Sequence, residues 1–313
     1  MASPHSASFM SDRFLVFAVC AALLPVTGAA QDQAPPAFST RSELVVLQVT
    51  VRERNGAYVE GLRQDAFSVI EDGEPQTVRL FSATDTPVTV GLLVDSSASM
   101  YASRSLVITG AGVFAETSHP RDELFALAFN EDVRPALDPS APFTRDSAAL
   151  RDALERSVTA RGRTALYDAI SAGVDYLAHG SRDRKALIVL SDGGDNASHA
   201  TQTDAVRKAQ ASSAVIYTVA LMDALSRDAN PRLLKDLADS SGGLAFRPRD
   251  AREFAEALRD VARAIRHTYA VAYTPTNAAS DGAFRQVRVV VAGPQGRPVV
   301  VRTRAGYTAG SPP

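Results

Sequence analysis

The chain has 313 residues, 45% hydrophobic and 22% charged, an ordinary balance for one large or two medium folded domains. Its net charge of −2 gives no reason to expect binding to nucleic acid or to a charged membrane surface. Cys20 is the only cysteine, which excludes a disulfide framework and a zinc–thiolate site.

The first thirty residues have the pattern of a secretory signal peptide. Arg13 precedes an apolar run over residues 14–26, and small residues end the run at 27–30. The run is short for a membrane span but has the length of a signal-peptide core. We expect cleavage after Ala30 and a mature protein that is secreted or held in the periplasm or cell envelope. The alternative is an uncleaved N-terminal anchor, which would be the chain's only membrane contact.

Strands are predicted on both sides of a central region. A polar, proline-bearing linker at 31–37 leads into a first strand-rich part at 38–85, and a second strand-rich part spans 268–308, before a tail at 309–313. The strands predicted there are Leu44–Val51, Phe67–Ile70, Thr77–Phe81, Tyr269–Tyr273, Phe284–Val291 and Val299–Arg304. Neither part has enough strands to close a sandwich, so we expect the two to pair into one β-sandwich-like domain.

Between residues 86 and 267, short apolar runs alternate with helical stretches. The predicted strands are Val88–Val94, Leu124–Phe129, Ala186–Leu190, Val215–Leu221 and Leu244–Phe246, with Val133–Leu137 as a candidate antiparallel edge. The predicted helices are Ser103–Ser118, Ser147–Thr159, Ala165–Ala178, Thr203–Ser212, Pro231–Asp239 and Ala251–Ile265. This alternation predicts an α/β domain with a doubly wound, mostly parallel sheet, inserted between the two halves of the β domain.

Oxygen-bearing side chains gather in three loops of this predicted sheet. The segment 95–99 (DSSAS) follows one strand, 191–193 (SDG) follows another, and 162–164 (GRT) opens a helix. Ligands of open α/β sheets bind beyond the carboxyl ends of the strands, which is where these loops belong. A carboxylate with hydroxyls is a hard-oxygen set that suits Mg²⁺ and, less specifically, Ca²⁺ or Mn²⁺.

These three motifs, in this order, resemble the metal-ion-dependent adhesion site of von Willebrand factor A (VWFA) domains. The resemblance covers residues 86–267 and implies a metal-ligand set of Asp95, Ser97, Ser99, Thr164 and Asp192. It also implies that an Asp or Glu of a protein partner completes the coordination of the metal.

The flanks extend the resemblance. Residues 59–73, the pair Phe284-Arg285, residues 299–304 and the pair Gly306-Tyr307 resemble the bacterial VWFA-related proteins that are abundant in Acidobacteria. The likeness therefore covers nearly the whole mature chain.

Each expected ligand also has a plain structural interpretation. Asp95, Ser97 and Ser99 could be helix caps, as could Thr164, and Asp192 could simply be a turn residue. Among their neighbours, we expect Asp195 and Asn196 to be solvated loop residues and Asp168 to lie on a helix surface.

We therefore expect a non-enzymatic, metal-dependent protein-binding module. The alternative is a structural or assembly component of the envelope, in which the metal only stabilises the loops. A metal-assisted hydrolase is disfavoured, because no general base or nucleophile–base pair is visible and the five histidines are scattered. We expect no organic cofactor or small-molecule substrate, because phosphate-loop and dinucleotide motifs are missing.

Overall fold

The computed structural model describes residues 44–221 and 228–310. The predicted signal segment, its cleavage point and the linker lie outside the described residues, as does the end of the predicted tail. All described residues belong to one compact unit, Ser42–Pro313. No helix within the described ranges is both long enough and apolar enough to cross a membrane.

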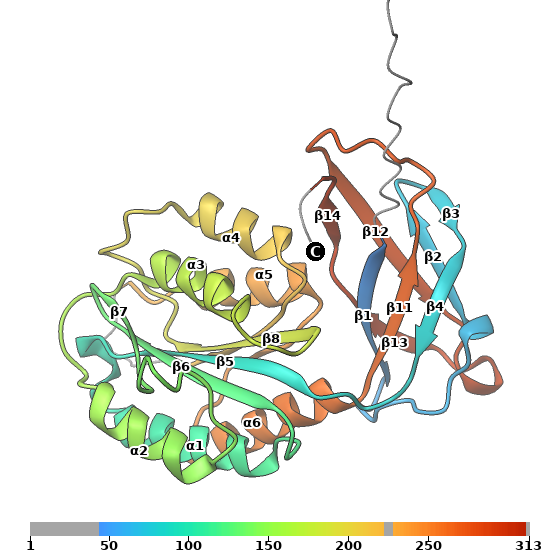
Figure 1. Cartoon of the computed structure of the whole chain (residues 1–313). Helices are drawn as coiled ribbons and strands as arrows, with labels where there is room; N and C mark the ends of the chain where they lie inside the picture. The colour runs from blue at the N-terminus through green and yellow to red at the C-terminus, as the bar shows by residue number, and fades with distance from the viewer. Residues whose placement is uncertain (1–43, 222–227, 311–313) are drawn as a thin grey trace, which may run out of the picture. The chain divides into compact units, whose positions relative to one another are not determined.

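A six-stranded sheet, called here the central sheet, has the strand order β10-β9-β8-β5-β6-β7. Figure 1 labels β5, β6, β7 and β8 of this sheet. Its strands are β5 (Val88–Asp95), β6 (Glu123–Phe129), β7 (Val133–Pro135), β8 (Arg184–Ser191), β9 (Val215–Ala220) and β10 (Ala245–Phe246). Neighbouring strands are parallel except for β7, which runs antiparallel to β6 at the edge, as the sequence predicts.

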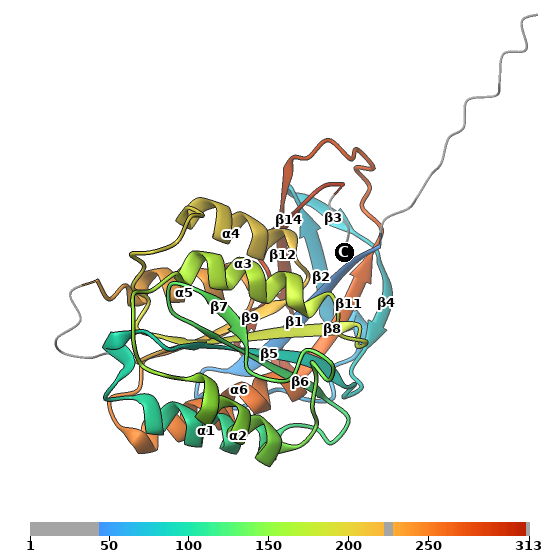
Figure 2. The same ribbon diagram turned by 60° about the vertical axis from the view of Figure 1, so that its left-hand side comes forward.

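Helices cover both faces of the central sheet, as Figure 2 makes plain. On one face, a hydrophobic core joins the sheet to α1 (Arg104–Thr117), α2 (Ser147–Ser157) and α6 (Ala251–Arg266). On the other face, a second core joins it to α3 (Leu166–Leu177), α4 (Gln202–Ala211) and α5 (Pro231–Ser241). All eight residues of β5 are buried, which explains why the strand reads as a continuous apolar run.

The flanking strands form two antiparallel sheets, with orders β13-β1-β11-β4 and β14-β12-β2-β3. Their bounds are β1 (Val45–Glu53), β2 (Phe67–Glu71), β3 (Glu74–Gln76), β4 (Val78–Ser82), β11 (Thr268–Tyr273), β12 (Phe284–Val291), β13 (Val299–Arg302) and β14 (Gly306–Thr308). The N-terminal β1 pairs with the C-terminal β11, and β2 pairs with β12. A third core fills the space between these sheets. The predicted fold class is confirmed, including the pairing of strands from the two flanks.

Two short strands were not predicted. Between the predicted strands Phe67–Ile70 and Thr77–Phe81, the chain makes a tight turn at Asp72-Gly73, with φ of 49° and 91°, so that β3 pairs back onto β2. The predicted strand at 299–304 ends at Arg302, because residues 303–305 cross to the other sheet and lead into β14.

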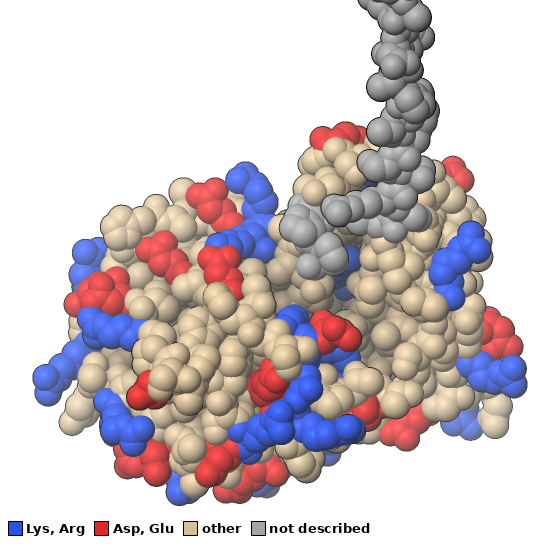
Figure 3. Space-filling model, viewed as in Figure 1, with Lys and Arg blue, Asp and Glu red and all other residues tan. Residues whose placement is uncertain are grey.

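Charged side chains of both signs are interspersed on the face drawn in Figure 3. Many of them are paired within one helix turn, as in Arg252–Glu256 of α6 at 3.7 Å. Such mixed surfaces suit a chain whose net charge is close to zero.

Candidate metal centre

The first loop of the candidate site holds a wholly buried carboxylate. Asp95 ends β5 in the middle of the central sheet. Its Oδ1 accepts a hydrogen bond from the backbone N–H of Ser97 at 2.9 Å, and its Oδ2 accepts one from the Ser191 hydroxyl at 2.6 Å. Because Ser191 ends β8, these bonds orient the carboxylate from two neighbouring strands.

The two serine hydroxyls of this loop point toward each other. The Oγ atoms of Ser97 and Ser99 are 3.1 Å apart, and Ser97 is buried. The chain here turns into a short 3-10 helix, Ala98–Met100, before α1. Ser97 is the N-cap residue of that turn, yet its side chain makes no capping hydrogen bond. The capping interpretation therefore does not account for its hydroxyl.

The second loop lies against the first. Backbone N–H groups of Ala98 and Arg161 donate to the carbonyls of Gly162 and Ser96, at 3.1 and 2.8 Å. Thr164 is buried at the end of this loop, next to Ala165, which is the N-cap residue of α3. The N-cap position itself is therefore an alanine, which has no side-chain group to cap the helix.

The third loop carries Asp192, which is 2% exposed. Its Oδ1 accepts a hydrogen bond from the backbone N–H of Gly194 at 2.9 Å. The third loop also binds the second, because Oδ1 of Asn196 accepts from the backbone N–H of Thr164 at 2.9 Å. The loops that hold the five predicted ligands are thus joined to one another at the carboxyl end of the central sheet.

The electrostatics of this place favour a cation. Burial raises the pKa of Asp95 to about 6, and the nearby Asp192 carboxylate adds to the rise, while hydrogen bonds from Ser191 and Ser97 oppose it. The two buried carboxylates and the Ser97 and Ser99 hydroxyls are oxygen groups of the kind that a hard divalent cation prefers. The described residues contain no group of three or more His, Cys, Asp or Glu side chains that could hold a metal.

Two supporting residues were not predicted. Ser191 orients Asp95, and its place beside Asp192 in the Ser-Asp-Gly motif was a signal that could have found it. Asn196 is an exposed loop residue, as expected, and its Oδ1 also accepts a hydrogen bond from the backbone N–H of Thr164, a contact that the sequence did not predict.

Two other residues near these loops also have defined contacts. Asp195 was expected to be a solvated loop residue, but its Oδ2 accepts from the backbone N–H of Tyr167 at 3.1 Å. Asp168 is half-buried and accepts hydrogen bonds from the backbone of His199 and Ala200, each at 2.9 Å. Both carboxylates therefore anchor the loop at 195–200 to the start of α3.

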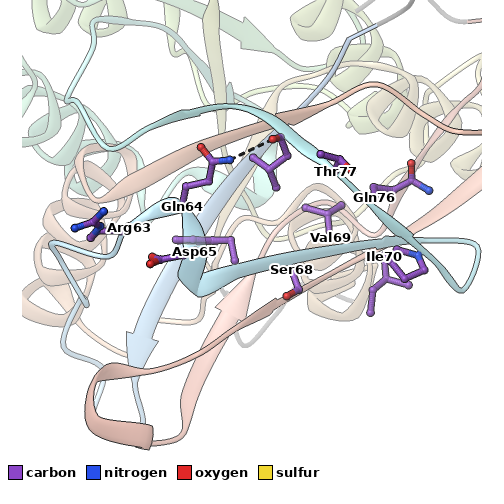
Figure 4. A pocket seen from close by; sticks show the side chains of 11 residues that line it. Arg63, Gln64, Asp65, Ser68, Val69, Ile70, Gln76 and Thr77 are labelled. Atoms are coloured by element: carbon purple, nitrogen blue, oxygen red, sulfur yellow. Dashed lines mark hydrogen bonds between the residues drawn. The ribbon is translucent and has the colours of Figure 1, made fainter.

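A hollow of about 640 Å³ lies elsewhere, in the β part of the unit (Figure 4). It is lined by residues 63–70 and 75–78, except Ala66, and Gln64 Nε2 donates to the carbonyl of Val78 beside it at 3.2 Å. None of the five predicted ligands lines it, so the hollow does not belong to the candidate metal centre.

The fold and loops define a class of protein: an open α/β sheet, helical on both faces, with an Asp-x-Ser-x-Ser loop at the carboxyl end of a central strand. The model of the von Willebrand factor type A domain matches residues 90–291, nearly two thirds of the chain. The chain belongs to this family, as the sequence motifs predict.

Solved structures resemble the fold at low sequence identity. A von Willebrand factor type A protein from Catenulispora acidiphila is 15% identical, with a TM-score of 0.50 over 85% of this chain and 73% of that chain. The vWF domain of the type V pili tip protein Mfa5 from Porphyromonas gingivalis is 15% identical, with a TM-score of 0.49 over 58% and 96%. An aerotolerance-related membrane protein from Bacteroides fragilis is 16% identical, with a TM-score of 0.46 over 56% and 98%. No curated protein matches the chain.

Proposed function

We propose that this protein is a metal-dependent protein-binding module, in which Asp95, Ser97, Ser99, Thr164 and Asp192 hold one divalent cation. Mg²⁺ suits this oxygen set, and Ca²⁺ or Mn²⁺ are the alternatives. A cation held by few charged ligands gains much from another oxygen, so an Asp or Glu of a partner protein would complete its coordination. This role is binding rather than catalysis.

The observation that carries the proposal is the burial of Asp95 beside Asp192. A carboxylate that is fully removed from water is costly unless a cation or several hydrogen bonds offset its charge. Asp95 has hydrogen bonds from Ser97 and Ser191, but its raised pKa means that these do not offset the burial. A divalent cation would remove this cost.

The hydroxyls support the same proposal. The hydrogen bonds of Thr164 with the third loop all use its backbone, as donor to Asn196 and as acceptor from Asn196 and Ala197. Its side-chain oxygen is therefore available as a ligand. The Ser97 and Ser99 hydroxyl oxygens lie 3.1 Å apart, and the Ser97 side chain also hydrogen-bonds Asp95.

The test is capture of partners from a cell-envelope extract, with Mg²⁺, with EDTA, and with an Asp95→Ala variant. We expect capture only by the native protein in Mg²⁺. Ser97→Ala should reduce capture, and Ser103→Ala is its matched control, because Ser103 lies just after the same loop and its side chain makes no capping bond. Capture that persists unchanged in EDTA would count against the proposal.

We also propose that the protein acts outside the cytoplasm, in the envelope or as a secreted protein. The apolar segment at 14–26 supports this proposal, and mass spectrometry of the N-terminus of the exported protein would test it. A mature chain that starts at Gln31 is the expected result.

A structural role of the cation is the second candidate. It is favoured by helix α5, whose first turn contacts the Asp192 loop and whose end contacts the β sheets. In that case EDTA would lower the melting temperature but leave partner capture unchanged, whereas the binding role predicts loss of capture at temperatures where the protein stays folded.

A further inference from the structure

A pocket of about 390 Å³, called here the edge pocket, opens beside helix α5. It is lined by residues of β9, α5 and β10 and by Arg247 and Arg302, and β10 is the strand at one edge of the central sheet. A volume of this size suits a small molecule. None of the five proposed cation ligands lines the edge pocket, so it is separate from the candidate metal centre.

One part of the pocket wall is apolar. Ala220 of β9 and Leu234 of α5 are both buried, and Ala245 and Phe246 of β10 continue the wall to the edge of the sheet. Thr218 also lines the pocket, but its hydroxyl donates to the carbonyl of Leu234 at 3.0 Å and is therefore already satisfied. A ligand in this pocket can thus remove an apolar group from water.

The rest of the wall has an excess of positive charge. Asp239 is the only acidic residue among the described residues that line the pocket, whereas the basic ones are Arg232, Lys235, Arg247 and Arg302. Asp239 accepts from Arg302 Nη1 at 2.8 Å and is also paired with Lys235. Burial tends to raise the pKa of Asp239, but hydrogen bonds from Lys235 and Arg302 lower it overall, so this carboxylate stays charged. It offsets the charge of only one of the four basic residues.

Arg232 and Arg247 account for most of this excess. Both are exposed, and neither forms an ion pair with another described residue. They stand on different elements, because Arg232 is in the first turn of α5 and Arg247 follows β10. The described acidic residues closest to them along the chain do not line the pocket. Asp228 is bonded to the third loop of the candidate metal centre, Asp250 caps α6, and Asp236 is exposed on α5.

We infer that the edge pocket binds a small organic acid that carries two carboxylates on an apolar body. Arg232 and Arg247 each offer a planar guanidinium, which binds a carboxylate well through two parallel hydrogen bonds. The apolar body of the ligand lies against the alanine, leucine and phenylalanine side chains of the wall. A bare inorganic anion would leave this wall uncovered, and a neutral ligand would leave the positive charge unopposed. The inference does not depend on the proposed cation, which concerns different residues.

The experiment titrates the whole protein with three matched probes and follows the backbone amide resonances of Ala245 and Phe246 by NMR. Isophthalate has two carboxylates on a benzene ring, benzoate has the same ring with one carboxylate, and succinate has two carboxylates without a ring. Ionic strength is kept constant with chloride. Buffers freed of divalent cations by a chelating resin keep the proposed cation site out of the measurement.

We expect saturable shifts with isophthalate, and a dissociation constant at least about fivefold lower than for benzoate or for succinate. Arg247→Gln and Arg232→Gln should each weaken the binding of isophthalate at least about fivefold. Arg259→Gln is the matched control, because Arg259 is an exposed arginine of α6 that does not line the pocket. This control should change the affinity only slightly.

Three results with the native protein would overturn the inference. The first is the absence of a saturable shift with isophthalate. The second is succinate binding as tightly as isophthalate, because the apolar wall would then take no part. The third is benzoate binding as tightly as isophthalate, because the second charge would then take no part. Equal weakening by Arg247→Gln and Arg259→Gln would also contradict it, since the attraction would then come from the general charge of the surface.

Discussion

The backbone N–H of Asn230 donates a hydrogen bond to the carbonyl oxygen of Asp192 at 3.1 Å. Asn230 is the N-cap residue of α5, and its side chain accepts from Leu233, so the helix begins at the loop of a proposed metal ligand. The same helix ends at Gly242, where an added Cβ would lie 2.5 Å from the carbonyl carbon of Thr303. Helix α5 therefore connects the proposed cation site with the segment that crosses between the two β sheets.

The contact between Asp192 and α5 depends on a glycine. Gly193 has a φ of +84°, and a Cβ there would lie 2.4 Å from the carbonyl oxygen of Asn230. We expect Gly193→Ala to lower the free energy of unfolding by about 2 kcal/mol or more, from left-handed strain plus displacement of the helix start. Urea denaturation measures this loss in the free energy of unfolding. Gly61→Ala is the control, because φ is +72° but nothing lies within 4 Å, so only the strain remains. If both variants lose the same free energy of unfolding, the contact between Gly193 and Asn230 does not contribute as stated.

Asp95→Asn should stabilise the fold when no metal is bound and should make it less stable than the native protein when metal is bound. The folded state raises the pKa of Asp95 from 3.8 to about 6, so its charged form destabilises the fold increasingly as pH rises through this range, and fully above it. In EDTA at pH 8, Asp95→Asn should therefore be more stable than the native protein by roughly 1–3 kcal/mol, with no difference near pH 3.

In Mg²⁺, the order should reverse, because only the native protein gains stability from the bound cation. Thermal unfolding of both proteins in EDTA and in Mg²⁺, each at pH 8, gives the four melting temperatures that this comparison needs. A native protein whose melting temperature does not respond to Mg²⁺, Ca²⁺ or Mn²⁺ would argue against the cation site.

A carboxylate at the opposite end of the central sheet should make stability depend on acid pH. Burial tends to raise the pKa of Glu123, but hydrogen bonds from Ser181 and Thr89, with the nearby Arg182, lower it overall. A lowered pKa in the fold gives stability that is present above the ordinary pKa and is lost as pH falls through the folded value.

Glu123→Gln should therefore remove part of the loss of stability between pH 7 and pH 3. Urea unfolding at several pH values measures this slope. Glu256→Gln, at an exposed site on α6, should leave the slope nearly unchanged. If the two variants have the same slope, the hydrogen bonds of Glu123 do not act as stated.

The stability of the β part should depend on two tyrosines that donate hydrogen bonds to the buried carboxylate of Glu71. Its Oε2 accepts from the phenol of Tyr273 at 2.5 Å and from that of Tyr307 at 2.9 Å. Burial, with this hydrogen bond to Glu71, raises the pKa of Tyr273 above its usual range, so the phenol remains a donor at all ordinary pH values. Tyr273→Phe should cost about 1–3 kcal/mol, because it leaves a buried carboxylate with one donor fewer.

Tyr307→Phe should cost less, because Tyr307 is more exposed than Tyr273. The double variant should lose more than the sum of the two single losses, since each tyrosine can partly satisfy Glu71 alone. A thermodynamic cycle from urea denaturation tests this, and strict additivity would contradict the shared acceptor.

The sequence predicted most of the fold because its patterns are local. The continuous apolar run of β5 and the alternation of strands with helices indicate a buried parallel sheet by themselves. The tight turn at Asp72-Gly73 is harder to predict from the sequence, because a two-residue turn and a longer loop have the same composition. The β14 strand was missed because three residues are too few to carry a period.

The five proposed ligands are those implied by the resemblance to VWFA domains, and the motifs that carry this resemblance are visible in the sequence alone. Tertiary structure decided which groups surround them. Ser191 donates to Asp95 across 96 positions of sequence, and Asn196 holds Thr164 across 32, so no local pattern could reveal either bond. Likewise, Arg304 is an ordinary arginine in the sequence, and only the fold closes off its Nε and places its guanidinium carbon 5.4 Å from the centre of the Tyr307 ring. The physical reason is that burial and hydrogen bonding depend on neighbours in space, whereas periodicity and motif order depend on neighbours in the chain.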